Sequence, residues 1–566
     1  MQNKHSISDL RVNLAGLFLP LEQSMNWTNR TSGKIGLILL SGALLLPLLP
    51  REAEGEELWK LAQDKKDVHR FSTLFLAQDI RDSLSDPEGI GKALLWCKQT
   101  GVTKVYIEEF RDGYQAKREA ILRVKDRFLA EGFAVAGCVT TTNMGKPSTG
   151  WKDVISCYTD PDTQEKVRGV FEYAAGLFDE IMIDDFWFTD CACRECDTAR
   201  KSRTVRIGNR SFPVPGESWS DYRSELMVQL SREYVLGAAR KVNPRVQLII
   251  KYPQWYDQFH ERGYEIVRET GDFDRIWVGT ETRDYGDKEW GGTVQYAAFF
   301  IMRWLGRVGA EKCGGGWYDW LGTTEKTYVE QARQTILGGA RESLLFCYGG
   351  LQGNTGPRNI EVLRSHIPEL LNVAAEVKSR KPIGIAAYKP PNSEPGREAR
   401  VFDFVGMMGL PLAPCHEFPT EAPAIFLSVH ALKDPGLADR LTRFIQSGKP
   451  VLITDGLAER LSGKVALDRP NVLRLNVNGA PASLLKLSGS EIDSLRVRLL
   501  QPFKAEFQAP SRTALYLFDD GSWVVENFND QPAQARLNGE AVSIPPRGWI
   551  CRWRGQGSDD DAPGFR

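Results

Sequence analysis

The sequence predicts an α/β protein in which a TIM (β/α)8 barrel is followed by a flavodoxin-like α/β domain and a C-terminal β-sandwich. Three observations on its 566 residues support this fold class. Eight apolar segments of strand length lie between residues 73 and 348. They recur every roughly thirty to sixty residues, with amphipathic segments between them, which is the spacing of βα units. After residue 380 this rhythm changes, which indicates further domains.

The barrel is expected over residues 66–380. Its strands are predicted at 73–78, 103–110, 133–140, 179–184, 246–252, 274–280, 311–317 and 343–348. Amphipathic helices are predicted at 118–131, 163–178, 220–242, 294–306, 325–339 and 359–380. A doubly wound sheet is the alternative, but no glycine-rich phosphate loop follows the first strand.

Two further domains are expected after the barrel. Residues 381–462 alternate short strand and helix patterns, which favours a flavodoxin-like α/β layer. Residues 465–556 hold strand segments separated by turns, which is typical of a β-sandwich. Residues 557–566 are polar and acidic, so we expect a disordered tail.

The N-terminal segment predicts export. Residues 35–50 form the only long apolar run, and Arg30 and Lys34 precede it, as in an export signal. Because the run lies late in the chain, we place a leader at 1–55 and consider Met25 an alternative start. We therefore expect a periplasmic or secreted protein. The alternative is an uncleaved membrane anchor, although sixteen residues are short for a span.

The composition limits the classes of partner and of active site that are expected. A net charge of −1 gives no reason to expect a nucleic-acid partner. The six histidines show no H-x-H or H-E-x-x-H spacing, which argues against a catalytic zinc hydrolase. The 15 Trp, 16 Tyr and 26 Phe residues offer aromatic faces that can hold sugar rings.

Carboxyl groups follow several predicted strands. In a TIM barrel, polar residues at the carboxyl ends of strands face the active site. Glycoside hydrolysis needs one carboxyl group as acid and a second as nucleophile or base. We expect Asp185 or Asp184, after strand four, to act with Glu281 after strand six, with Asp319 after strand seven as the competing partner. Side chains alternate along a strand, so the two adjacent aspartates cannot both point inward.

Other polar and aromatic residues lie at the same strand ends and are candidates for binding a sugar. The carboxylates among them could instead cap a helix or pair with a lysine, and the aromatic residues could pack in the core. The set is Asp79, Glu108, Glu109, Trp187, Lys251, Trp255, Arg283, Trp317, Tyr318 and Tyr348.

A cysteine cluster follows the paired aspartates. Cys191, Cys193 and Cys196 have the spacing of metal ligands. A tetrahedral zinc needs a fourth ligand, for which Cys157 is the first candidate and Cys138 the second. Four thiolates would leave no open position, so the zinc would be structural. Disulfides or free thiols are the alternative.

The order of domains and these motifs resemble the β-galactosidases of glycoside hydrolase family 42 and their uncharacterised relatives. The family carries C-x-C-x-x-C after strand four and an upstream cysteine, which Cys157 in Ser-Cys-Tyr-Thr-Asp-Pro matches. The resemblance implies zinc and a trimer built on the flavodoxin-like domain.

The catalytic pattern departs from that family. Its acid/base is the Glu of an Asn-Glu pair ending strand four, where this chain has Asp184 and Asp185. Its nucleophile is a Glu after strand seven, where this chain has Asp319. The resemblance therefore implies the architecture of a relative outside the family proper, and does not imply galactosidase activity.

Together these features predict an exported glycoside hydrolase that uses two carboxyl groups on an oligo- or polysaccharide. The alternative is a carbohydrate-binding barrel without catalysis. A third interpretation takes the flavodoxin-like segment as an amidotransferase with Cys415 and His416, but no nucleophile elbow surrounds Cys415.

Overall fold

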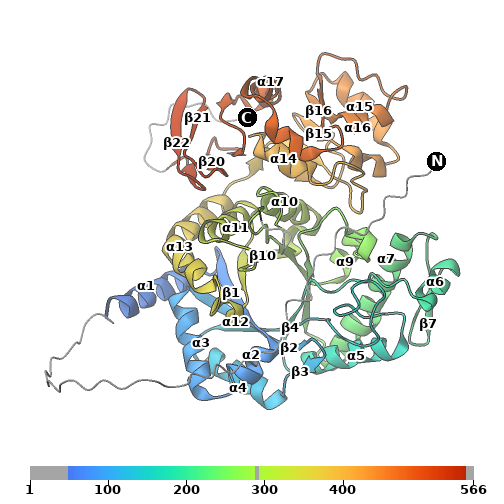
Figure 1. Cartoon of the computed structure of the whole chain (residues 1–566), viewed down its shortest axis with the longest axis vertical. Helices are drawn as coiled ribbons and strands as arrows, with labels where there is room; N and C mark the ends of the chain where they lie inside the picture. Colours follow the sequence, from blue (N-terminus) through green and yellow to red (C-terminus); the bar gives the residue numbers. More distant parts are fainter. Residues whose placement is uncertain (1–48, 287–291, 556–566) are drawn as a thin grey trace, which may run out of the picture.

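The computed structural model describes residues 49–286 and 292–555 (Figure 1). The predicted leader lies for the most part outside these residues, and the predicted tail at 557–566 lies wholly outside them. The first helix, α1, covers Leu49–Lys65. No helix in the described ranges is long and apolar enough to cross a membrane.

Eight parallel strands form a closed barrel, as predicted. Closure is visible at Thr73, which pairs with Val105 of the next strand and with Leu345 of the last. In barrel order the strands are β1 (Arg70–Phe75), β2 (Val102–Arg111), β4 (Ala134–Val139), β5 (Glu180–Ile183), β8 (Gln247–Tyr252), β9 (Arg275–Gly279), β10 (Cys313–Asp319) and β11 (Glu342–Phe346).

Helices surround the barrel and separate its strands in the chain. Two of them, α3 and α5, begin where the sequence offers a capping carboxylate followed by proline. Asp86 accepts a hydrogen bond from Gly89 N at 2.8 Å, and Asp160 accepts one from Thr163 N at 2.9 Å. The long helices are α3 (Pro87–Gln99), α4 (Arg118–Ala130), α5 (Pro161–Ala175), α7 (Trp219–Leu230), α10 (Ala297–Gly309), α11 (Glu325–Leu337) and α13 (Gly356–Lys378). Shorter ones are α2 (Ala77–Asp82), α6 (Arg194–Lys201), α8 (Gly237–Val242), α9 (Ile266–Asp272) and α12 (Tyr348–Leu351).

The barrel interior is filled by a small apolar cluster that includes Leu74, Met182 and Trp277. The run Gly314-Gly-Gly in β10 makes room for the largest of these side chains. A Cβ atom on Gly314 would lie 2.0 Å from the Trp277 ring. Gly314 is therefore required by close packing against Trp277.

A five-stranded parallel sheet follows, with helices α14 (Val401–Met407), α15 (Leu437–Gln446) and α16 (Asp455–Arg460). Its strand order is that of flavodoxin, since the first two strands in the chain exchange places. In spatial order the strands are β14 (Leu412–Cys415), β13 (Ile385–Tyr388), β15 (Ile425–Leu427), β16 (Val451–Thr454) and β17 (Val472–Leu475). The last strand lies beyond residue 462, where the sequence suggested that this domain ends.

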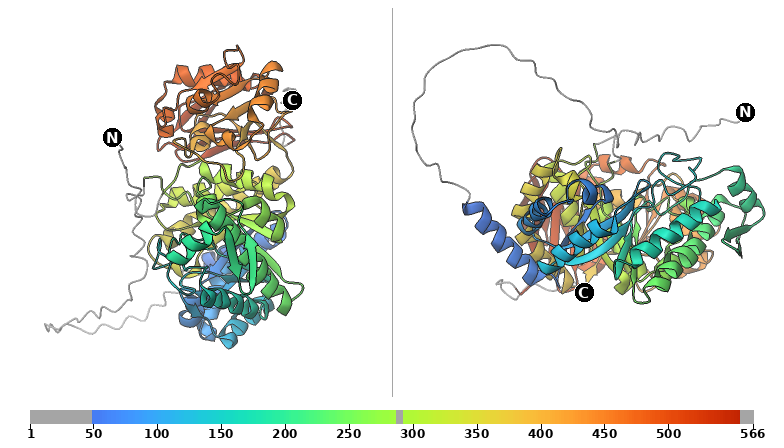
Figure 2. Two further views of the ribbon diagram at one scale, coloured as in Figure 1. Left: turned by 90° about the vertical axis from the view of Figure 1, so that its right-hand side faces the viewer. Right: turned by 90° about the horizontal axis from the view of Figure 1, so that it is seen from below.

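Two antiparallel sheets end the chain, together with helix α17 (Gly489–Leu500). The first contains β12 (Pro382–Ile383), β19 (Thr513–Phe518), β20 (Trp523–Asn527) and β23 (Trp549–Arg552). The second contains β18 (Phe507–Gln508), β21 (Ala533–Leu537) and β22 (Glu540–Ile544). Strand β12 follows the barrel directly, yet Ile383 pairs with Leu517 of β19. Figures 1 and 2 show the α/β domain and these sheets on one side of the barrel, beside α10 and α11.

Candidate active site

Asp184, directly after β5, is the centre of a polar network at the carboxyl ends of the barrel strands. Its Oδ2 accepts hydrogen bonds from Arg111 Nη2 at 2.7 Å and from Thr140 Oγ1 at 2.9 Å. Its Oδ1 accepts from Lys251 Nζ and from the backbone N of Asp185 at 3.0 Å. These four donors occupy both carboxylate oxygens. Asp184 is 1% exposed, and its side chain is therefore held as an anchor rather than presented to solvent.

Glu108 in β2 extends this network toward α2. Its Oε2 accepts from Arg111 Nε at 2.9 Å and from Ala77 N at 3.0 Å, and its Oε1 contacts Thr140 Oγ1, whose single hydroxyl proton lies between Glu108 and Asp184. Burial raises the pKa of Glu108, and the Arg111 guanidinium opposes that rise. Arg111 thus binds two buried carboxyl groups, which come from different strands.

Asp184 and Asp185 have opposite protonation preferences. Burial would raise the pKa of Asp184, but the Lys251 and Arg111 cations hold it well below its usual range. Burial and the Asp184 carboxylate raise the pKa of Asp185 to about 8. Asp185 is half-buried. At neutral pH the pair therefore places one ionised and one largely protonated carboxyl group next to each other.

Glu281 lies two residues after β9 and is 2% exposed. Its buried Oε2 meets no hydrogen-bond donor among the described residues. Burial raises the pKa of Glu281 well above its usual range, the Arg283 guanidinium opposes this rise, and Asp185 and Asp319 add to it. The carboxyl groups of Asp185 and Glu281 are therefore close enough to affect each other's protonation.

Asp319, at the end of β10, is held by Arg283. The guanidinium binds both carboxylate oxygens, from Nη2 to Oδ2 at 2.8 Å and from Nε to Oδ1 at 3.2 Å. Gln331 of α11 supports both residues, because its Nε2 donates to Asp319 O and its Oε1 accepts from Arg283 N, each at 3.2 Å. Asp319 therefore serves mainly to orient Arg283 beside Glu281.

Aromatic rings line the same end of the barrel. Lys251 Nζ lies 3.8 Å from the centre of the Trp317 ring, which explains how a buried lysine is stabilised beyond its ion pair. Trp255 is half-buried, and its ring lies 5.0 Å from the Arg262 guanidinium. The Arg262 guanidinium also lies 5.1 Å from the Phe188 ring.

Several expected sugar-binding residues do not face this region. Trp187 is fully buried, and its Nε1 donates to Ser231 Oγ at 2.8 Å. Tyr318 is buried on the outside of the barrel, where its ring meets Tyr328 of α11 at 5.3 Å. The reason is strand alternation: Trp317 points inward, so Tyr318 points outward.

The positions of three other candidates are explained by the fold rather than by a role in binding a sugar. Tyr348 lies in α12, where it packs against the ring of Phe75 at 5.2 Å. Asp79 lies in α2 and accepts from Leu76 N at 2.9 Å, and burial raises its pKa to about 6. Glu109 is fully buried without a hydrogen-bond partner among the described residues, and burial raises its pKa well above the usual range.

The structure thus brings together Asp184, Asp185, Glu281, Asp319, Glu108, Lys251, Arg283 and Trp317 of the predicted residues. It adds Arg111 and Thr140, which sequence reasoning missed. The available signal for Arg111 was its position, three residues after Glu108 at the end of a predicted strand. Thr140 ends another predicted strand, but a lone threonine carries no specific signal.

The four predicted cysteines form one cluster. Cys157 Sγ lies 3.7 Å from Cys193 Sγ and 3.6 Å from Cys196 Sγ, which are 3.5 Å apart. Cys191 completes the group, with all four sulfurs within 4.8 Å of one another. Four thiolates at a Zn–S distance of about 2.3 Å would lie about 3.8 Å apart. The four cysteines could therefore hold a metal ion.

The amidotransferase interpretation has no support in the site of Cys415. Its thiol is partly covered and donates to Ala387 O at 3.6 Å. Burial raises the pKa of Cys415 to about 12, so the thiolate that a nucleophile requires is not formed at neutral pH.

Comparison with known proteins agrees with the barrel. A protein of Saccharolobus solfataricus, described as uncharacterized protein SSO3021, is 27% identical over 354 residues, covering 57% of this chain and 57% of that protein. The match thus spans little more than half the length of this curated relative.

Two solved structures share the fold. A catalytic mutant of Gan42B, a GH42 β-galactosidase from G. stearothermophilus, has a TM-score of 0.57 at 10% identity, over 85% of this chain and 97% of that one. The α-L-fucosidase isoenzyme 2 from Paenibacillus thiaminolyticus has a TM-score of 0.55 at 11% identity, over 84% and 91%.

Residues 55–362 match the family described as "Probable glycosyl hydrolase, catalytic domain". This range contains all eight barrel strands and every carboxyl group described above. It covers more than half of the chain, and the protein therefore belongs to this family of probable glycosyl hydrolases.

Proposed function

We propose that the protein hydrolyses glycosidic bonds with Asp185 as general acid and Glu281 as the second carboxyl group. The observation that supports this most directly is the contrast between Asp184 and Asp185. Asp184 is saturated by four donors and ionised, whereas Asp185 is protonated at neutral pH. An acid with a pKa near the working pH is what protonation of a leaving oxygen requires.

The reaction follows from these positions. Asp185 donates its proton to the glycosidic oxygen as the bond to the anomeric carbon breaks. Glu281 acts in its ionised form, which the Arg283 guanidinium favours against the effect of burial, and attacks that carbon or activates a water molecule toward it. Two neighbouring carboxyl groups repel each other when both are ionised, so the pair retains one proton. One group can then act as the acid while the other acts as the base. Asp319 holds Arg283 in place through two hydrogen bonds.

The test is hydrolysis of a broad panel of aryl glycosides and polysaccharides by the full chain. For any glycoside that is cleaved, Asp185→Asn should lower kcat/KM by about 10²- to 10⁴-fold. The loss should be much smaller for a dinitrophenyl glycoside, because its leaving group needs no proton. Glu281→Gln should be inactive on both substrates. Glu119→Gln, on the exposed face of α4, is the matched control and should retain activity.

A non-catalytic barrel would give a different result. The parent protein would bind oligosaccharides without cleaving any, and Asp185→Asn, Glu281→Gln and Asp319→Asn would leave that binding unchanged. Such an outcome would overturn the proposal.

We also propose that Cys157, Cys191, Cys193 and Cys196 hold a structural zinc ion. The sulfur separations of 3.5 to 3.7 Å support it, since they match a four-thiolate site. The ion would join the segment before α5 to the loop that leads into α6. A closed thiolate site of this kind supplies folding free energy and has no position for substrate.

Export and trimer formation are proposals as well. The basic and apolar pattern of residues 30–50 supports export, and the resemblance to the family 42 enzymes supports the trimer. N-terminal sequencing of protein recovered outside the cytoplasm would test the first. Sedimentation equilibrium would test the second, and a monomer would exclude it.

A further inference from the structure

The loop after β9 carries Glu281 and Arg283, and it contacts other parts of the chain at several points. Within the barrel, Thr280 N donates to Trp317 O and Asp284 N donates to Gly322 O, each at 2.8 Å. Beyond these contacts, Arg283 N is bound by Gln331 of α11. The geometry of the proposed catalytic residues therefore depends on what fixes this loop and α11.

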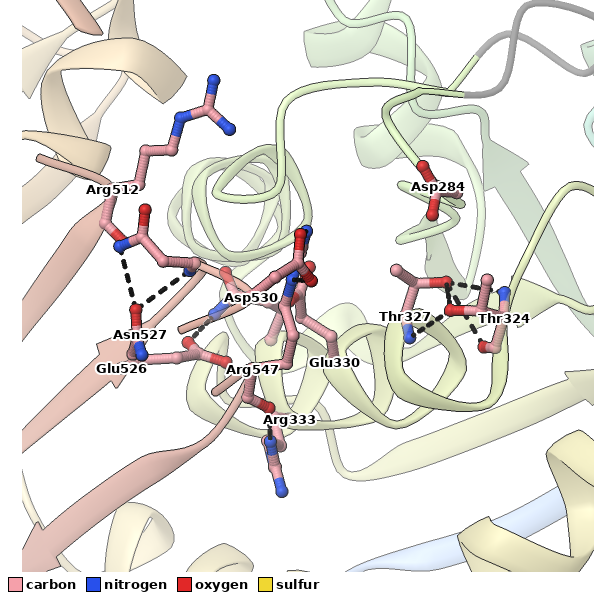
Figure 3. A network of polar contacts seen from close by, with 12 residues as sticks. Asp284, Thr324, Thr327, Glu330, Arg333, Arg512, Glu526, Asn527, Asp530 and Arg547 are labelled. Carbon is pink, nitrogen blue, oxygen red and sulfur yellow. Dashed lines mark hydrogen bonds and ion pairs between the residues drawn. The ribbon is translucent and has the colours of Figure 1, made fainter. Parts of the chain in front are cut away.

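Arg547, from the C-terminal sheets, contacts both of them. Its guanidinium lies 4.6 Å from the centre of the Tyr285 ring, in the loop after β9. Its Nη1 lies 3.5 Å from Glu330 Oε2 of α11. Its Nε and Nη2 donate to the two carboxylate oxygens of Asp530, at 2.9 and 3.2 Å. The Arg547 side chain is only 7% exposed, while Asp530 lies at the surface. Figure 3 shows Arg547 with Asp530 and Glu330.

Helix α11 has one face toward the C-terminal sheets and another toward the site. On the first face, Arg333 Nη1 donates to Arg547 O at 2.6 Å, and Gln334 Nε2 donates to Tyr516 OH at 2.7 Å. On the second face, Gln331 holds Asp319 and Arg283. The same helix therefore connects residues of the C-terminal sheets to residues of the proposed active site. Figure 3 shows Glu330 and Arg333 of this helix beside Arg547 and Glu526.

Glu330 makes the contact with Arg547 different from ordinary domain packing. It is 1% exposed, and neither of its oxygens has a hydrogen-bond donor in the described ranges. Burial and Glu526 raise the pKa of Glu330 well above its usual range, and Arg547 Nη1, at 3.5 Å, is a cationic neighbour of its carboxyl group. Replacing such a buried pair by apolar residues is often neutral or stabilising. Arg547 joins three segments, through Tyr285, Glu330 and Asp530, and this geometry points to a role in orienting them.

We propose that Arg547 is a positioning residue for the proposed glycosidase site: by holding Tyr285 and Glu330 it fixes the loop after β9, and so sets Arg283 and Glu281 relative to Asp319. The C-terminal sheets are then part of the support of the active site. The proposal rests on the proposed function for its kinetic consequence, but not for its structural one.

Hydrogen exchange of the full chain tests the structural consequence without any substrate. In Arg547→Ala and in Tyr285→Leu, backbone amides in peptides covering residues 276–286 should exchange at least about tenfold faster than in the parent. Arg552→Ala, which changes an exposed arginine of β23 that pairs with Glu540, is the control and should leave this segment unchanged. Arg547→Lys, which keeps the charge but loses the planar group over Tyr285, should give an intermediate rate.

The kinetic arm uses any glycoside that the parent cleaves. Arg547→Ala and Tyr285→Leu should each lower kcat by about tenfold or more with little change in KM, because the acid and the sugar contacts stay while the second carboxyl group loses its orientation. The double variant should lose no more than the stronger single variant, since both act through one contact.

Two results would overturn the proposal. One is exchange that quickens only in residues 507–552, which would make Arg547 a residue of its own domain alone. The other is additive losses in the double variant. If exchange changes as expected but Asp185→Asn keeps full activity, the positioning role stands and the proposed function fails.

Discussion

The backbone N–H of Asp185 donates a hydrogen bond to the side chain of Asp184 at 3.0 Å, so the two residues that share a peptide bond also share one electrostatic site. Asp184 takes the charge because Lys251 and Arg111 surround it. Asp185 keeps its proton because it is buried and because that charge is next to it. The chain thus uses an ionised neighbour to raise the pKa of an acid.

Activity should fall as pH rises through about 8. The reason is that Asp185 acts in its protonated form, and its pKa is raised to about 8. The measurement is the pH dependence of kcat/KM on a glycoside with a poor leaving group. A dinitrophenyl glycoside should not show this alkaline limb in its bond-breaking step, and an alkaline limb shared by both substrates would contradict the role of Asp185.

Asp185→Asn should stabilise the fold progressively as pH increases. The folded pKa of Asp185 lies above its unfolded value, so its contribution to stability is fully present below about pH 4 and is lost up to about pH 8. The loss in the parent is at most about 1.4 kcal/mol per pH unit over that window. Thermal unfolding at pH 5, 7 and 9 should show the variant gaining on the parent from the first value to the last. A constant difference would contradict the raised pKa.

Asp184→Asn should be strongly destabilising. It leaves Lys251 and Arg111 buried without their shared carboxylate, which typically costs about 3 to 5 kcal/mol. The two cations would also act on Asp185 with no ionised neighbour, so its pKa should fall and the alkaline limb should move to lower pH. Denaturant unfolding measures the first effect and the pH profile measures the second. Retained stability would mean that Asp184 is not the anchor.

Removing the cysteine cluster should release one zinc ion per chain and lower the melting temperature. Cys157→Ser takes away one of four thiolates, and a structural site of this type depends on all of them. Elemental analysis of the purified protein gives the metal content. Cys313→Ser changes a buried cysteine outside the cluster and serves as the control. Full zinc content in Cys157→Ser would exclude the site.

Gly279→Ala should impair activity more than stability. A new Cβ would lie 2.7 Å from Glu281 Oε2 and 2.8 Å from the backbone N of Gln254. The backbone cannot easily move, so the Glu281 side chain is displaced, and a shift of about 1 Å can cost on the order of a hundredfold in rate. Gly91→Ala in α3 meets nothing within 4 Å and is the matched control. Equal activity of the two variants would mean that the position of Glu281 does not depend on the absence of a side chain at Gly279.

The barrel could be predicted from the sequence because each strand is an apolar segment that lies between amphipathic helical segments. The first strand shows the limit. It was predicted at 73–78 but covers Arg70–Phe75, because the apolar run continues past the strand into α2. Asp79, expected at the end of that strand, therefore lies in a helix.

The acids were identified by their position after strands, but their roles depend on side-chain partners that no spacing reveals. Asp184 and Asp185 look alike in the sequence, and only the positions of Lys251 and Arg111 separate them. Trp187 illustrates the remaining difficulty: its place past a strand end suggests a pocket, whereas the local turn after β5 directs its indole toward Ser231.

The position of strand β12 determines where the chain can be divided into independent parts. Because Pro382–Ile383 already belongs to the sheet that β19, β20 and β23 complete, the flavodoxin-like unit interrupts that sheet in the chain as an insertion. A fragment that starts after the insertion lacks an edge strand. A shortened protein that joins residue 383 to the segment before α17 keeps both the barrel and the whole sheet. The molecule is therefore best divided at the two ends of its α/β unit, after residue 383 and before α17, and not between the barrel and the rest of the chain.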